Sequence, residues 1–219
     1  MLQMRFTGRG APAVLSIALF VAPAAASERS YSMDAFARDV SAAVHAGGGE
    51  GRTLERVAAA VTHFLRDGAL DDRYQQPHPG LEVTTYLARL APDASFSIAV
   101  LVLRPGARTP VHDHHTWTVW GTLRGHEHEV RYTRSTVKDG EFPALQVVAE
   151  HTLPEDGVSV IPSPPGDVHR VENVGTIPSV SIHVHGADIS TQTRSRYDLE
   201  RHAVIPFVQS YERPDSEAR

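Results

Sequence analysis

The fold is decided by the stretch Gly106-Ala107-Arg108-Thr109-Pro110-Val111-His112-Asp113-His114. Side chains two residues apart in a β-strand lie on the same face, so His112 and His114 are expected to point the same way. Two neutral imidazoles side by side form half of a site for a transition metal. An isolated His-x-His pair is a weak signal, and a third ligand must come from elsewhere in the chain.

A second segment supplies that candidate ligand. It reads Pro164-Pro165-Gly166-Asp167-Val168-His169-Arg170-Val171-Glu172-Asn173. A turn passes into a strand here, which can bring His169 to the first pair. The two segments, with Gly125 closing the first, match the two motifs of the cupins in the expected order. Together they predict a metal site on His112, His114 and His169.

Short β-rich runs surround both segments. They span residues 83–90, 96–104, 116–123, 127–133, 145–152, 158–162, 168–174 and 179–185. Short strands with Gly and Pro between several of them, and with no helical crossovers, predict a sandwich or barrel. We therefore expect a mostly β cupin fold, a double-stranded β-helix or jelly-roll barrel. It would occupy residues 81–211 together with a C-terminal arm, and residues 212–219 would form a polar tail.

Two helices are expected before the barrel, within residues 31–80. Ser32 can cap the first, whose apolar residues recur every fourth position and which Gly47-Gly48-Gly49 ends. Thr53 can cap the second, which Gly68 closes. Residues 70–82 are polar and rich in proline, and they predict a loop.

Residues 1–30 are left out of the fold. Arg5 and Arg9 precede an uncharged apolar run that ends in small residues, which is the pattern of a secretory signal peptide. If this segment acts as a signal peptide, we expect the protein to be exported to the periplasm. The alternative is a wrongly assigned start codon. Translation that begins at Met33 would leave the protein in the cytoplasm.

The composition limits the chemistry. The chain has no cysteine, which excludes disulfides, thiolate metal sites and a cysteine nucleophile. Its net charge of −5 gives no indication of a nucleic-acid partner, and nothing in the mature chain suggests a membrane partner. The oligomeric state is left open. The 13 histidines are the distinctive feature, because histidine is the commonest metal ligand.

The predicted site has no carboxylate ligand. Many cupins place a glutamate four or five residues after His-x-His, where this chain has Thr118 and Val119. Three imidazoles alone leave coordination positions open, which is typical of a catalytic site. Imidazole does not by itself choose among iron, zinc, copper and nickel.

The chain resembles the thiol dioxygenases, namely cysteine dioxygenase and its bacterial relative 3-mercaptopropionate dioxygenase. The resemblance covers about residues 33–211 and rests on four segments: Thr109 to His114 with Trp117, Leu123-Arg124-Gly125, His169 to Asn173, and Ser181 to Val184. It implies a ferrous iron on His112, His114 and His169. It also implies that dioxygen converts a small thiol carboxylate, 3-mercaptopropionate or cysteine, to its sulfinic acid.

The resemblance further implies an outer-sphere catalytic group. The family carries a Ser-x-His-x-Tyr motif, which reads Ser181-Ile182-His183-Val184-His185 here. Alternation places Ser181, His183 and His185 on one face, where serine would orient His183 and His183 would orient the third residue. The change of the last position from tyrosine to His185 puts its proton-donor role in doubt.

Two residues are expected to bind substrate. In the 3-mercaptopropionate branch an arginine follows the motif tyrosine by nine residues, which corresponds to Arg194 here. The alternatives are a solvated arginine in a polar tail and the nearby Arg196 as the substrate-binding group. A guanidinium matches a carboxylate with two parallel hydrogen bonds. Trp117 is the second candidate, with a core or pocket-wall position as its alternative. No acidic residue for a substrate amino group is identifiable, so 3-mercaptopropionate is expected to be preferred over cysteine.

Other interpretations stay open. His126 and His128 repeat the His-x-His spacing, but the adjacent glutamates Glu127 and Glu129 favour a solvated hairpin. The chain could be another metal-dependent cupin enzyme, such as an isomerase, a hydrolase or a dioxygenase acting on carbon. It could also be a non-catalytic cupin that senses a ligand.

Overall fold

The computed structural model describes residues 30–136 and 141–214. The expected signal segment, residues 1–30, lies outside the described residues except for its last position. None of the helices in the described part of the chain is long and apolar enough to cross a membrane.

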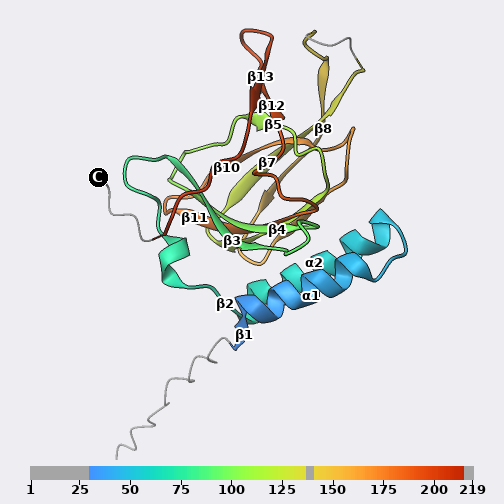
Figure 1. Ribbon diagram of the computed structural model, residues 1–219. Helices are drawn as coiled ribbons and strands as arrows, with labels where there is room; N and C mark the ends of the chain where they lie inside the picture. Colours follow the sequence, from blue (N-terminus) through green and yellow to red (C-terminus); the bar gives the residue numbers. More distant parts are fainter. Residues whose placement is uncertain (1–29, 137–140, 215–219) are drawn as a thin grey trace, which may run out of the picture.

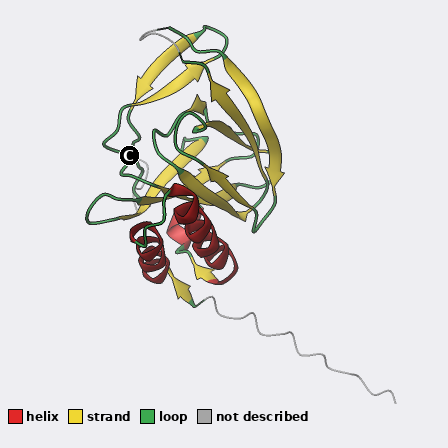
Figure 2. Ribbon diagram, turned by 90° about the vertical axis from the view of Figure 1, so that its right-hand side faces the viewer, coloured by secondary structure: helices red, strands yellow, loops and turns green. Residues whose placement is uncertain are grey.

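Two antiparallel sheets face each other and enclose the interior of a barrel (Figures 1 and 2). The five-stranded sheet has the order β3 (Val83–Leu90), β4 (Ser97–Leu103), β11 (Ser179–His185), β6 (Thr118–Arg124) and β9 (Val158–Ile161). The six-stranded sheet has the order β13 (Ala203–Phe207), β12 (Arg194–Asp198), β5 (Val111–His112), β10 (Val168–Asn173), β7 (Glu127–Arg134) and β8 (Leu145–Leu153). This jelly-roll arrangement confirms the mostly β, cupin-like fold.

Two helices cover the outer face of the five-stranded sheet (Figure 1). They are α1 (Met33–His45) and α2 (Glu50–Asp67), with the strands β1 (Tyr31–Ser32) and β2 (Gly68–Ala69) paired beside them. Ser32 caps α1 as expected, because its hydroxyl accepts a hydrogen bond from the Ala35 amide at 3.1 Å. A 3-10 turn, η1 (Asp72–Gln75), interrupts the expected loop.

The predicted cap of the second helix was wrong. Helix α2 begins at Glu50, one turn before Thr53, and its N-cap is Gly49 with a φ of 82°. Glycine tolerates this left-handed backbone, which turns the chain into the helix. Thr53 is buried inside the helix instead. Gly68 follows the last helical residue, as expected.

Strand β11 is buried on both of its faces. Val180, Ile182 and Val184 belong to the cluster that packs against the helices. The alternate side chains, among them His183 and His185, face the barrel interior and line its cavity. All seven residues of β11 are buried, so the helix layer and the interior each use one face of the strand.

All eight expected strands are present, with ends within two residues of their predicted ends. Strands β1, β2, β12 and β13 were not predicted, and β5 is shorter than the strand expected to carry both His112 and His114. Strand β5 has only two residues, and β12 reads Arg-Ser-Arg-Tyr-Asp, which carries no apolar alternation. The mixed, polar segment expected after residue 186 therefore contains two strands that extend the six-stranded sheet.

Candidate metal centre

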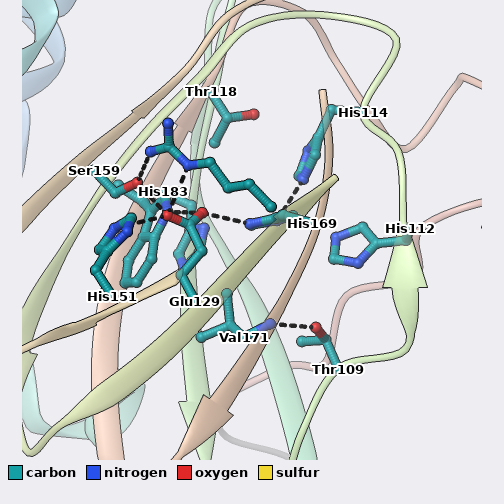
Figure 3. Close-up of polar contacts among 12 residues, drawn as sticks. Thr109, His112, His114, Thr118, Glu129, His151, Ser159, His169, Val171 and His183 are labelled. Atoms are coloured by element: carbon teal, nitrogen blue, oxygen red, sulfur yellow. Dashed lines mark hydrogen bonds and ion pairs between the residues drawn. The ribbon is translucent and has the colours of Figure 1, made fainter. Parts of the chain in front are cut away.

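Three histidines from two separate segments of the chain meet inside the barrel (Figure 3). His112 ends β5, and β10 places His169 directly opposite it in the antiparallel register. The strand stops at His112, so His114 lies in the following irregular segment and not on the strand as predicted. Nε2 of His114 is nevertheless 2.9 Å from Nε2 of His169, and one nitrogen from each of the three rings lies within 4.8 Å of the other two.

The donor set fits a transition metal. Burial, followed by the neighbouring His169 charge, lowers the pKa of His112 well below its ordinary value, and burial with the neighbouring histidines does the same for His114. Both rings are therefore neutral near pH 7. The Nδ1–H of His112 donates to the Pro110 carbonyl at 2.9 Å, which leaves Nε2 of that ring as a lone-pair donor. Neutral imidazoles of this kind are suitable ligands for iron, zinc, copper or nickel.

Two buried aspartates hold the segment that carries His114. The carboxylate of Asp167 accepts hydrogen bonds from the backbone amides of His114 at 3.3 Å and His115 at 2.8 Å. Arg134 joins this carboxylate, at 3.3 Å, to that of Asp113, at 2.7 Å. The position of the second ligand is thus fixed by ion pairs that no local sequence pattern indicates.

The histidines open onto a cavity of about 390 Å³. Polar, charged and apolar side chains line it. Besides the three histidines, the polar and charged ones are Thr85, Thr109, His183, His185, Arg194, Arg196, Gln209, Ser210 and Glu212, and the apolar ones include Leu81, Val83, Leu101, Val171, Ile189 and Phe207. Such a space is of the size of small-molecule sites in proteins.

Ser181 and His183 are in contact as expected. The Ser181 hydroxyl and Nε2 of His183 form a hydrogen bond of 2.9 Å. The His183 ring stacks on Trp120, its register partner on β6, with ring centroids 5.3 Å apart. Burial, followed by the charge of His169, lowers the pKa of His183 to about 3, so this ring is neutral at physiological pH.

His185 is held differently from the expectation. Its ring lies 6.0 Å from that of His183 between centroids, and its Nδ1 forms a 3.0 Å hydrogen bond with the hydroxyl of Thr118 instead. It stacks on the ligand His114, with centroids 5.0 Å apart. Thr118, its register partner on β6, therefore takes the orienting role that the resemblance had implied for His183.

Arg194 lies in the cavity wall and is 1% exposed. Its guanidinium donates to the Asp113 carbonyl at 2.8 Å and to Gln209 Oε1 at 3.2 Å, and it lies 4.5 Å above the Phe207 ring. Burial lowers its pKa to about 10, which keeps it protonated at neutral pH. Within the described residues, no carboxylate forms an ion pair with it.

Two further charged groups, Arg196 and Glu212, line the cavity. Arg196, on the same strand as Arg194, places its guanidinium 4.3 Å from the Phe207 ring. Glu212 lines the cavity and pairs with His78 at 3.9 Å. Glu212 is thus an acidic residue of the cavity wall that the sequence reasoning did not identify. Glu212 lies far along the chain from every motif, so no spacing could indicate it.

Trp117 is not among the side chains that line this cavity. It belongs to the core cluster that packs against the helices. Its indole touches Gly186 so closely that a Cβ on that glycine would lie 2.3 Å from the ring. These contacts favour the alternative prediction, a core position for Trp117, over the prediction that it binds substrate.

Glu127 and Glu129 do not lie in a solvated hairpin, which corrects the sequence-based interpretation. Both are fully buried. They point inward from β7, whereas Val130 and Tyr132 belong to a hydrophobic cluster on the other face. Glu129 accepts a hydrogen bond from Nδ1 of the ligand His169 at 2.8 Å (Figure 3). Their inward orientation could have been predicted from the alternation of side chains along the strand. The neighbouring histidines, His126 and His128, drew the interpretation towards a solvated hairpin instead.

No family model matches the chain. Among solved structures, TT1209 from Thermus thermophilus is similar at 18% identity and a TM-score of 0.40, over 54% of this chain and 96% of that chain. The cupin domain of a transcriptional regulator of the XRE family from Enterobacter cloacae is similar at 15% identity and a TM-score of 0.36, over 48% and 96%. The cupin domain of Cnp3 from Schizosaccharomyces pombe has 20% identity and a TM-score of 0.36, over 51% and 68%. Similarities this distant do not bear on activity.

Proposed function

We propose that the protein is a thiol dioxygenase that oxidises a small thiol carboxylate to its sulfinic acid. One observation carries the proposal: three converging imidazoles open onto the same cavity as a buried guanidinium, which has no carboxylate partner among the described residues. The first feature suits a metal with open coordination positions, and the second suits a substrate carboxylate. The resemblance to the thiol dioxygenases favours ferrous iron over the other metals that imidazole binds.

The overall reaction is R–SH + O2 → R–SO2H. Both oxygen atoms end on sulfur, which supplies all the electrons, so no further reductant is required. When bound to His112, His114 and His169, a ferrous ion supplies the redox chemistry and lowers the pKa of a coordinated thiol.

The cavity residues would position the substrate. Arg194 would hold the carboxylate, and Phe207 with Gln209 would keep the guanidinium in place. A substrate held at both its sulfur and its carboxylate is pre-oriented for reaction, which lowers the entropic part of the barrier.

His185 would act beside the reacting atoms. It is buried against His114, and burial holds its pKa well below the ordinary value, so it is neutral. A neutral imidazole can donate one hydrogen bond and accept another. With Nδ1 on Thr118, the second nitrogen remains for a ligand in the cavity.

The test is anaerobic loading with Fe²⁺ followed by oxygen-consumption assays. The substrates are 3-mercaptopropionate, cysteine and cysteamine, with mass spectrometry of the product. We expect uptake of one O2 per thiol carboxylate and a sulfinic acid product. Iron-loaded protein that consumes no oxygen with any of these thiols would contradict the proposal. His169→Ala serves as the matched inactive control.

A further inference from the structure

We propose that Glu129 is a positioning residue that fixes the tautomer and the orientation of the ligand His169. The proposal rests on the metal centre of the proposed function and adds a residue outside the ligand set. Glu129 stands on β7, next to the strand β10 that carries His169. Its Oε1 accepts the Nδ1–H of His169 at 2.8 Å (Figure 3).

The carboxylate is itself held by donors on several sides. Each of them donates through nitrogen or a hydroxyl group to one of its two oxygens. They are Trp120 Nε1 at 3.2 Å, Arg131 Nε at 3.0 Å and Ser159 Oγ at 2.6 Å. Nε2 of His151 also lies at ion-pair distance, 3.0 Å from the carboxylate. His151 is the register partner of Glu129 on β8, and its side chain is 37% exposed.

This arrangement determines which nitrogen of His169 faces the metal centre. With its hydrogen on Nδ1, the ring presents the lone pair of Nε2, which lies 2.9 Å from Nε2 of His114. A carboxylate in this position also fixes the ring orientation, which makes the imidazole a better metal ligand. His112 is held only by a neutral carbonyl, and Nδ1 of His114 has no hydrogen-bond partner in the described structure. Among the three ligands, His169 is thus the one that receives a charged partner.

The donors around Glu129 favour a carboxylate over an amide. Glu129 is 0% exposed, and an ionised carboxylate without partners would be unstable there. A glutamine would have to turn its NH2 group towards donors such as Arg131, or else towards His169. Either orientation sets an N–H against an N–H. Glu129→Gln should therefore disturb the ring of His169 while nearly preserving the volume of the side chain.

The test measures metal affinity without any thiol. Apo wild type, Glu129→Gln and Glu129→Asp are titrated anaerobically with Co²⁺ against a competing chelator. We expect Co²⁺ binding about tenfold to hundredfold weaker in Glu129→Gln, and partial recovery in Glu129→Asp. Glu127→Gln is the matched control, because Glu127 is equally buried on the same face of β7 and bonds to Ser179. Its Co²⁺ affinity should equal that of the wild type.

A second measurement needs no variant. In apo wild type labelled with ¹⁵N-histidine, the chemical shifts of His169 should report hydrogen on Nδ1. Hydrogen on Nε2, or unchanged Co²⁺ affinity in a folded Glu129→Gln, would overturn the proposal. Wild type that binds no metal would overturn this proposal and the proposed function together. Metal binding that depends on Glu129 without thiol oxidation would support this proposal and contradict only the proposed function.

Discussion

His169 on β10 is the register partner of His112 on β5, across one antiparallel pair of the six-stranded sheet. Two ligands that are far apart in the chain are thereby brought together by backbone hydrogen bonding. A shift of one residue in this register would turn His169 to the opposite face of the sheet. The candidate metal centre therefore depends on the pairing of a strand of only two residues.

The first prediction concerns the ligands. Replacing His112, His114 or His169 by alanine should abolish iron retention and turnover, because two imidazoles remain where three converge. Iron per chain is measured after anaerobic loading and desalting. His128→Ala is the control, since His128 repeats the His-x-His spacing but bonds to Thr152. Full iron content in His169→Ala would show that the second motif is misassigned.

The second prediction concerns carboxylate recognition. Arg194→Ala should reduce kcat/KM for 3-mercaptopropionate and cysteine by the equivalent of about 2–4 kcal/mol, the cost of losing a charge-assisted contact. Cysteamine lacks a carboxylate and should be little affected. Arg196→Ala, on the same strand, should have a smaller effect because Arg196 is exposed. An equal loss on all three thiols would assign Arg194 a structural role.

The third prediction concerns the choice between the two thiol acids. Glu212 is an acidic side chain in the cavity wall, and it pairs with His78. We expect 3-mercaptopropionate to remain preferred over cysteine, and Glu212→Gln to change neither kcat/KM value more than a few-fold. A selective loss for cysteine in Glu212→Gln would instead assign Glu212 to the substrate ammonium group.

The fourth prediction concerns His185. His185→Phe keeps a ring against His114 but removes both nitrogens, so kcat should fall by about 10²-fold if His185 donates or accepts a proton. Iron content should not change. Thr118→Val, which removes only the hydrogen bond to Nδ1, should give a smaller decrease. Equal rates for wild type, His185→Tyr and His185→Phe would exclude His185 from the chemistry.

The fifth prediction concerns stability and pH. Burial raises the pKa of Glu127 to about 7 from its ordinary 4.5, against the opposing effect of the Ser179 and Ser181 hydroxyls. The folded state thus retains a proton that the unfolded state loses as the pH rises past 4.5. The free energy of unfolding should fall between pH 4.5 and 7 for this reason, by up to about 3 kcal/mol.

Glu127→Gln lacks this ionisation, so the comparison isolates it. The variant should gain stability relative to wild type as the pH rises from 4.5 to 7, and the difference should level off above pH 7. Denaturant unfolding of the metal-free proteins measures it. A difference that does not change with pH would contradict the raised pKa.

The sequence was sufficient to predict those features that depend on a local pattern of residues. The spacing around His112, His114 and His169 predicted the ligand set, since the motifs combine a turn with the start of a strand. The alternation in β11 predicted that Ser181, His183 and His185 share the inner face, because side chains in a strand alternate with a period of two. Eight strands followed from their apolar runs and the turn residues between them.

Only the tertiary structure decided which groups surround those residues. From the sequence, Glu129 was interpreted as a solvated charge beside His128. It contacts His169 because β7 pairs with β10. Thr118 meets His185 through the register of β6 and β11. Local sequence records which residues can share a face. It does not record which strand will lie beside them, because that choice is made by packing and backbone pairing between distant segments.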